Sequence, residues 1–324
     1  MSGRYEKEKK FENRIIEKLK VTPSVMTDYY YHLIGSGKSL ATTYNYINYV
    51  VAFINFTYRD NVKDDFYLSV KPVDINKYIA SLRTKEVNGK IERTSDSIRT
   101  VQWSALNSFF QFLTPEYIRE NPVTNTNRPK MKDKPNVTYL TEDEISELLN
   151  HVEVQSNRRL RNRDLCWLKL GFSTGLRVSA IVQIDIDDID FENNQIRVTE
   201  KGDYDEYVMF GDKMKEQLKL CIRDREKISD KISTNALFIS QLGKRFSADM
   251  LAKQLTQYAG NVTTKKVTPH VMRHSCATNL YEKTGDIYLC SKQLHHKNVS
   301  TTERYAELSN MKKREATNIL DDLI

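Results

Sequence analysis

Residues 121–136, with the sequence NPVTNTNRPKMKDKPN, divide this chain of 324 residues into two parts. The segment holds three prolines, four asparagines and four lysine or arginine residues, and it offers almost no apolar surface to bury. Proline, asparagine and charge at this density are typical of a linker rather than of a helix or strand. A chain of this length can bury two separate cores. We therefore predict two domains, residues 1–120 and 139–324, joined by a basic interdomain linker over residues 121–138.

The positive charge of the chain is concentrated in the first part. Residues 1–140 contain 22 lysines and arginines against 15 aspartates and glutamates, whereas residues 141–324 contain 28 of each. The whole net charge of +7 therefore belongs to the first part. Positive charge on one domain favours a polyanionic partner, although a basic surface that is merely solvated fits the charge equally well.

The first part shows helical periodicity. In SLATTYNYINYVVAFINFTY (residues 39–58), Tyr44, Ile47, Val51 and Ile54 recur at the spacing of one helix face. The segments 73–83 and 97–114 repeat an amphipathic pattern of the same kind. We expect this part to be a small, basic, all-helical domain.

The second part is predicted to be mixed. It opens with a capping box, in which Thr141 is the N-cap and Glu144 follows three positions later. Residues 161–175 are predicted to form a buried helix that ends at Gly175, and residues 184–210 alternate in the manner of short antiparallel strands. Helical patterns resume from residue 211. The predicted fold class is thus mainly α, with a small antiparallel β-sheet in the second domain.

The sequence also indicates a cellular compartment. It contains no apolar run of about 18 residues and begins with the polar stretch MSGRYEKEKKFENR, so we expect neither a membrane span nor a signal peptide. Its four cysteines are scattered and form no CxxC pair. A disulfide framework and a cysteine-rich zinc site are both disfavoured, and a cytoplasmic location fits best.

The sharpest local pattern is TPHVMRHSCATNL, residues 268–280. Thr268 and the proline after it predict a helix start, and His270 and Arg273 then lie on one helical face near the positive end of the helix. That arrangement favours an anion such as phosphate, although a structural histidine–arginine pair explains the local pattern equally well. Zinc is disfavoured, because HxxRH and the adjacent His295 and His296 lack acidic or cysteine partners at ligand spacing.

A tyrosine follows the histidine pair in LHHKNVSTTERYAELS, residues 294–309. The hydroxyl of Tyr305 is a poor nucleophile at neutral pH, since an unperturbed tyrosine has a pKa of about 10. It could attack a substrate only if other segments supplied cations and a proton relay. STGLR places Arg177 just after a Gly-Leu turn, which alone means little because most arginines are surface residues.

In this order the segments resemble the tyrosine recombinases, the phage-integrase family of DNA strand-exchange enzymes, over nearly the whole chain. TGLR resembles the motif that contains the family's first arginine, and TEKGDYDEYV resembles the β-hairpin that carries its lysine. HVMRHSCAT is similar to the family's HxLRHTFAT box, and LHHKNVSTTERY is similar to its LGHxxxxTTxxY box. The residues that match catalytic positions are Arg177, Lys201, His270, Arg273, His296 and Tyr305. Two positions depart from the pattern: Ala180 stands where an acidic residue is usual, and His295 where glycine is usual. Both departures concern positioning rather than a catalytic atom.

The resemblance implies a two-domain architecture that forms a C-shaped DNA clamp, and a site-specific recombinase or integrase that needs no metal or other cofactor. Tyr305 would form a 3′-phosphotyrosyl bond while the two arginines hold the phosphate oxygens. Lys201 would protonate the leaving 5′-oxygen, His270 would accept the tyrosine proton, and His296 would hydrogen-bond a phosphate oxygen.

The resemblance also implies partners. Double-stranded DNA with inverted-repeat core sites would bind a homo-tetramer, which would exchange strands through a Holliday junction in the bacterial nucleoid. The apolar C-terminal segment, residues 319–324, would pack on its own domain or, as the family favours, dock in trans into a neighbouring protomer. The early start of the helical pattern leaves little room for an arm-binding domain and favours an Xer-like or small mobile-element enzyme. Two alternatives stay open: a type IB topoisomerase, and a DNA-binding accessory factor that has lost cleavage.

Overall fold

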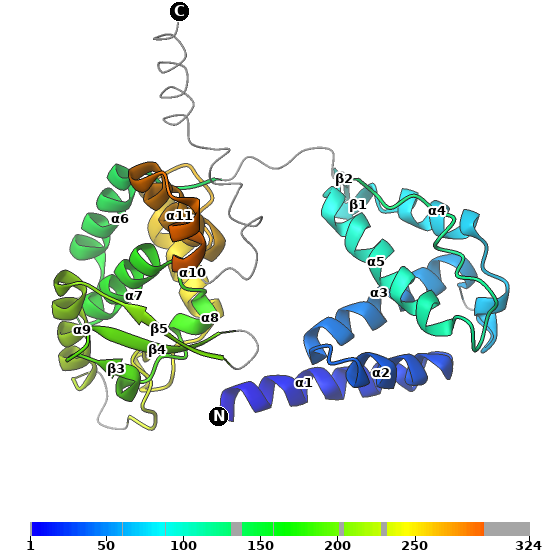
Figure 1. The fold of residues 1–324 in the computed structure, drawn as a ribbon, viewed down its shortest axis with the longest axis horizontal. Helices are drawn as coiled ribbons and strands as arrows, with labels where there is room; N and C mark the ends of the chain where they lie inside the picture. Colours follow the sequence, from blue (N-terminus) through cyan, green and yellow to red (C-terminus); the bar gives the residue numbers. More distant parts are fainter. Residues whose placement is uncertain are drawn as a thin grey trace, which may run out of the picture. The chain divides into compact units, whose positions relative to one another are not determined.

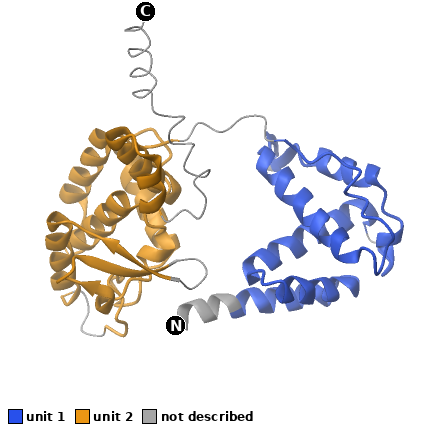
Figure 2. Cartoon of the chain, viewed as in Figure 1, with its two compact units in different colours: residues 1–135 blue, residues 136–324 orange. Residues whose placement is uncertain are grey.

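The computed structural model describes residues 2–59, 61–87, 89–130, 138–157, 159–200, 204–227 and 232–294. The chain forms two compact units, Met1–Pro135 and Asn136–Ile324 (Figure 2). The division falls within the predicted linker, whose limits at residues 121 and 138 stay a prediction. Within the described ranges, no helix has the length and apolar character needed to cross a membrane.

Unit 1 is built mainly from helices that pack around an aromatic core. Tyr29 and Phe109, from two different helices, meet edge to face with ring centroids 5.1 Å apart, and Phe53 is fully buried beside them in the same cluster. The long helix predicted over residues 39–58 is present, because the hydroxyl of Ser39 accepts the amide of Thr42 and caps its first turn. The helices are α1 (Ser2–Leu19), α2 (Val25–Gly35), α3 (Leu40–Tyr58), α4 (Pro72–Ser81) and α5 (Asp96–Leu113), with a 3₁₀ turn at Phe66–Leu68 (Figure 1).

The expectation that unit 1 is all-helical is wrong. A two-stranded antiparallel hairpin, β1 (Thr84–Val87) and β2 (Lys90–Arg93), separates α4 from α5. The Asn-Gly pair at residues 88–89 is the sequence signal for this turn, and Gly89 has the positive φ of 73° that such a turn requires. Apolar periodicity gives no signal for β2, because every residue of this strand is exposed.

The first half of the predicted linker packs against unit 1. Val123 is fully buried in the unit 1 core, and the indole N–H of Trp103 donates to the hydroxyl of Thr126 over 2.8 Å. The hydroxyl of Thr100 donates to the carbonyl of Pro129 over 3.1 Å. Residues 123–129 are therefore tied along α5.

Unit 2 combines helices with one small sheet, which confirms the predicted fold class. The hydroxyl of Thr141 accepts the amide of Glu144, whose carboxylate accepts the amide of Thr141, so the predicted capping box is formed. The sheet is antiparallel in the order β3 (Ile189–Asp190), β4 (Gln195–Glu200), β5 (Tyr204–Met209) and follows a 3₁₀ turn at Ile186–Asp188. The helices are α6 (Glu142–Gln155), α7 (Arg161–Thr174), α8 (Val178–Ile181), α9 (Asp212–Arg225), α10 (Ala248–Gly260), α11 (Pro269–Thr284) and α12 (Ile287–Gln293) (Figure 1).

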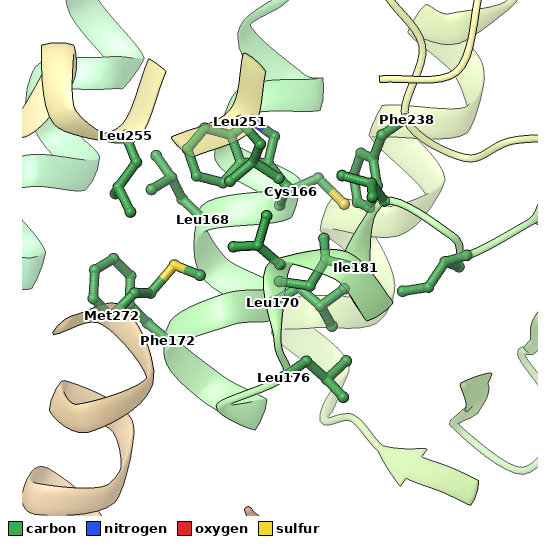
Figure 3. Close-up of a cluster of buried hydrophobic side chains, with 14 of the residues drawn as sticks. Cys166, Leu168, Leu170, Phe172, Leu176, Ile181, Phe238, Leu251, Leu255 and Met272 are labelled. Carbon is green, nitrogen blue, oxygen red and sulfur yellow. The ribbon is translucent and has the colours of Figure 1, made fainter. Parts of the chain in front are cut away.

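Helix α7 forms the centre of the unit 2 core. Leu168 and Leu170 of this helix are fully buried, and Figure 3 shows them among apolar side chains from α8, α10 and α11. Gly171 makes close packing with α11 possible, because a Cβ at this position would lie 2.4 Å from Cε of Met272. The functional segments described below begin where α7 ends and where α11 begins.

Candidate functional site

The turn after α7 places Arg177. Gly175 ends the helix in the left-handed conformation, with φ of 67°, as predicted. Leu176 then enters the core with 1% of its surface exposed, and Arg177 becomes the N-cap of α8, half-buried, with its carbonyl accepting the amides of Ala180 and Ile181. A Cβ on Gly175 would lie 2.5 Å from Cδ2 of Leu294, so the leucine side chain would have to move, and the positive φ itself favours glycine.

Helix α11 positions His270 and Arg273. Its start is the one predicted, with the hydroxyl of Thr268 accepting the amide of Val271 over 3.4 Å and Pro269 in the first turn. His270 is exposed in that turn, whereas Arg273, one turn later, retains only 5% of its accessible surface. The two residues share a helical face at its positive end but differ sharply in their contact with solvent.

The guanidinium of Arg273 joins three segments that are far apart in the sequence. One terminal nitrogen donates to the carbonyl of Gly175 over 2.8 Å, and the other donates to the carbonyl of Leu294. Gly175 lies two residues before Arg177, and Leu294 is the first residue of the LHHKNVSTTERY segment. Arg273 therefore ties the TGLR turn and Leu294, at the start of the histidine–tyrosine segment, to α11.

A cysteine near Arg273 is chemically inert at neutral pH. Burial raises the pKa of Cys276 to about 12, against the lowering effect of the Arg273 charge, and the neighbouring Cys290 raises it further. The thiol of Cys276 is therefore protonated and cannot serve as a nucleophile.

The sequence departure at Ala180 has a structural counterpart. Ala180 belongs to α8 and is 5% exposed, within the same apolar cluster as Leu176 and Ile181. At the position where the resemblance predicts an acidic residue, this chain has the packed methyl group of Ala180. The backbone of Arg177 is positioned by the start of α8 and by the turn at Gly175.

The structure describes three of the six predicted catalytic residues. Arg177, His270 and Arg273 lie on or beside α8 and α11, and Arg273 connects their two segments. Lys201, His296 and Tyr305 lie outside the described residues, as does His295. The strands that flank Lys201 in the sequence, β4 and β5, pair from Gln195 with Met209 to Glu200 with Tyr204, so the predicted hairpin strands are present.

Sequence reasoning missed two members of this arrangement, Gly175 and Leu294, because both act through backbone carbonyls. The signal for Gly175 was its position at the helix end. For Leu294 the only signal was its place at the head of the histidine box. In the part of the chain that the structure describes, no three histidine, cysteine or acidic residues form a group that could hold a metal ion.

Comparison with known proteins agrees with this geometry. The family described as the phage integrase family matches residues 138–312. Tyrosine recombinase XerD of Staphylococcus saprophyticus is 31% identical over 268 residues, which cover 80% of this chain and 89% of that protein.

Two solved structures share the fold. The XerH site-specific recombinase bound to palindromic difH, in a post-cleavage complex, has a TM-score of 0.68 and 20% identity over 87% of this chain and 80% of that one. A lambda integrase tetramer bound to a Holliday junction has a TM-score of 0.66 and 19% identity over 87% and 76%. At such identities the likeness shows the fold alone, whereas the match of sequence shows the family. This chain belongs to the phage integrase family and is an Xer-like tyrosine site-specific recombinase.

Proposed function

We propose that this recombinase cuts and rejoins double-stranded DNA through a covalent bond between Tyr305 and a 3′-phosphate, without metal or ATP. Attack by the phenolic oxygen breaks the bond to the 5′-oxygen, which leaves as a hydroxyl once protonated. The phosphodiester energy is retained in the tyrosyl bond, and attack by the 5′-hydroxyl of another strand reverses the step. Two such exchanges on paired inverted-repeat sites proceed through a Holliday junction on the DNA of the nucleoid.

The observation that carries this proposal is the junction at Arg273. Its guanidinium bonds the carbonyls of Gly175 and Leu294, so the turn before Arg177 and the residue before the histidine pair are tied to the helix that carries His270. Phosphodiester transfer builds negative charge on the non-bridging oxygens, and prepositioned cations that stabilise this charge are usually the largest catalytic contribution. We assign that work to Arg177 and to the positive charge of Arg273.

Proton transfer is assigned to the remaining residues. Lys201, between β4 and β5, donates the proton to the leaving oxygen, a task suited to a compact ammonium on a long side chain. His270 is exposed at the positive end of α11 and accepts the tyrosine proton. His296 donates a hydrogen bond to a phosphate oxygen.

The test is a covalent adduct. Incubation with a nicked target duplex should give a protein–DNA species that survives detergent, and Tyr305→Phe should abolish it. Tyr288→Phe is the matched control, since Tyr288 is another tyrosine of unit 2 with 60% of its surface exposed, and this variant should keep the adduct. An adduct that persists in Tyr305→Phe refutes the assignment of the nucleophile. The type IB topoisomerase alternative is not favoured, because the relatives by sequence are tyrosine recombinases.

We further propose that the recombinase assembles as a tetramer on paired DNA sites, with the C-terminal segment of one protomer docked on the next. A groove of about 710 Å³ in unit 2 supports this assignment. Its apolar lining includes Leu149, Phe172 and Leu289, and three lysines line it as well. The lysines are Lys169, Lys213 and Lys283.

The C-terminal sequence NILDDLI complements this groove. It combines apolar residues at 319, 320, 323 and 324, which suit the apolar lining, with two aspartates, which complement Lys169 and Lys213. Lys283 is paired with Glu142, the acidic residue of the lining. The shared fold of the lambda integrase tetramer, which is bound to a Holliday junction, supports the stoichiometry. Lys213→Glu should weaken assembly on DNA, measured by sedimentation, and Asp321→Lys in the same chain should restore it. Unchanged assembly in Lys213→Glu contradicts the docking proposal without affecting the adduct test.

A further inference from the structure

The β1–β2 hairpin of unit 1 carries none of the predicted catalytic residues (Figure 1). It is a two-stranded antiparallel sheet, and among the described residues β2 pairs with β1 alone. Every residue of β2 is exposed, and Ile91, in the middle of the strand, keeps 79% of its accessible surface. An open strand edge of this kind is a template on which another strand can pair.

The hydrogen-bond pattern of the hairpin shows which backbone groups face the open edge. The amide of Thr94 donates to the carbonyl of Arg83 over 2.9 Å, so these two residues form a hydrogen-bonded pair. Hydrogen-bonded and non-hydrogen-bonded pairs alternate along an antiparallel ladder. Lys90 and Glu92 therefore direct their backbone groups to β1, whereas the N–H and C=O of Ile91 point away from it.

A second copy of β2 fits this edge in an antiparallel register centred on Ile91. Each Ile91 would form a hydrogen-bonded pair with its own copy, so the two exposed isoleucines would cover each other on one face. On the other face, Lys90 of each copy would lie opposite Glu92 of the other. Unlike charges directly opposite stabilise a strand pair, and Glu92 is already 3.6 Å from Lys85 of β1.

The neighbouring registers of the same pairing oppose like charges. A register centred on Lys90 sets two lysines opposite each other, and one centred on Glu92 sets two glutamates opposite each other, which destabilises the pair. A centre between two residues would set an outward-facing backbone group against an inward-facing one. Charge on an edge strand usually prevents pairing, but the order Lys-Ile-Glu is complementary to itself in this one register.

We propose that β2 is a self-recognition surface that pairs with β2 of a second copy of this chain and joins two hairpins into one four-stranded sheet. The contact is isologous, since both copies contribute the same residues. A strand pair of this length buries far less than the roughly 1,200 Å² of a stable interface, so it specifies how two protomers meet rather than holding them together alone. The inference goes beyond the proposed function and does not depend on it.

The test traps the pairing as a disulfide in the full chain. Ile91→Cys, with oxidised glutathione as the oxidant, should give a disulfide-linked dimer, because the Cα atoms of a hydrogen-bonded pair are about 5.5 Å apart, within reach of a disulfide. The four native cysteines are buried and do not compete. Glu86→Cys is the matched control, since Glu86 is exposed and lies opposite Ile91 within the hairpin. Three strand spacings, about 14 Å, would separate Glu86 from its copy in the four-stranded sheet, so this variant should not crosslink.

Two charge variants in the Ile91→Cys background test the register. Lys90→Glu sets an introduced glutamate against Glu92 of the second copy, and Glu92→Lys sets an introduced lysine against Lys90 of the second copy. Each variant alone should lose the crosslink. An equal mixture should restore it as a dimer of one chain of each kind, identified by mass spectrometry, because every opposing charge is then unlike.

Two results would overturn the proposal. The first is a crosslink yield for Ile91→Cys that does not exceed the yield for Glu86→Cys. The second is an equal yield in the separate charge variants and in their mixture, because contact between the hairpins would then not depend on the register.

Discussion

Two arginine–aspartate pairs of unit 2 have the same geometry, but the arginine is buried in one and half exposed in the other, which allows the contribution of burial to be measured. In each pair the arginine donates twice to one carboxylate oxygen: Arg163 to Asp164 over 2.9 and 2.7 Å, and Arg197 to Asp188 over 3.0 and 2.7 Å. The side chains of the first pair are 6% and 0% exposed, and those of the second 51% and 14%. The same substitution, aspartate to asparagine, can therefore be made in two environments.

Asp164→Asn should destabilise unit 2 by about 3–5 kcal/mol, because it leaves the buried charge of Arg163 uncompensated. The carboxylate of Asp164 also accepts the indole N–H of Trp167 and the side chains of Gln254 and Tyr258, so the loss is not confined to one pair. Asp188→Asn should cost about 1 kcal/mol or less, since Arg197 is half exposed to the screening solvent and keeps the carboxylate of Asp205 3.8 Å away.

Urea denaturation followed by tryptophan fluorescence measures both losses. The chain has two tryptophans, one in each unit, so a Trp103→Phe background leaves Trp167, in the affected network, as the reporter of unit 2. Equal losses in the two asparagine variants would refute the reasoning, because they would show that burial does not decide the strength of these pairs.

Three further predictions concern single positions. Gly175→Ala should lower the free energy of unfolding by about 1–3 kcal/mol, because Gly175 has a positive φ and the added Cβ would contact a leucine side chain. The control is Gly211→Ala, whose added Cβ would have no atom within 4 Å and should change the thermal midpoint little. Burial raises the pKa of Glu144, but hydrogen bonds from Lys265 and from the capping box outweigh it and lower the pKa overall. The stability that this carboxylate contributes is therefore present at neutral pH and lost as the pH falls through its lowered pKa; Glu144→Gln should flatten the acid limb of a stability–pH curve, and an unchanged limb would contradict this. Cys276 should resist alkylation by iodoacetamide at about pH 8 in the folded protein and react after denaturation, because it is buried and its pKa is about 12; rapid labelling of the folded chain, detected by mass spectrometry, would contradict its burial.

Local signals predicted most of the elements. Helix α3 begins after Ser39 and α11 after Thr268 because a side-chain cap and a periodic apolar face act within a few residues. Periodicity did not predict the hairpin of unit 1, because it detects elements with a buried face and every residue of β2 is exposed.

The sequence by itself determined the residue types of the site and their order along the chain, from Arg177 to Tyr305, and it determined where α7 ends and α11 begins. It did not determine that Arg273 is buried, because its partners lie 98 and 21 positions away, at Gly175 and Leu294. Helical periodicity places a histidine and an arginine three positions apart on the same face, and it does not tell which of the two is buried. Only the tertiary structure leaves one in solvent and sets the other against two backbone carbonyls, since burial and long-range hydrogen bonds depend on which surfaces the fold brings together.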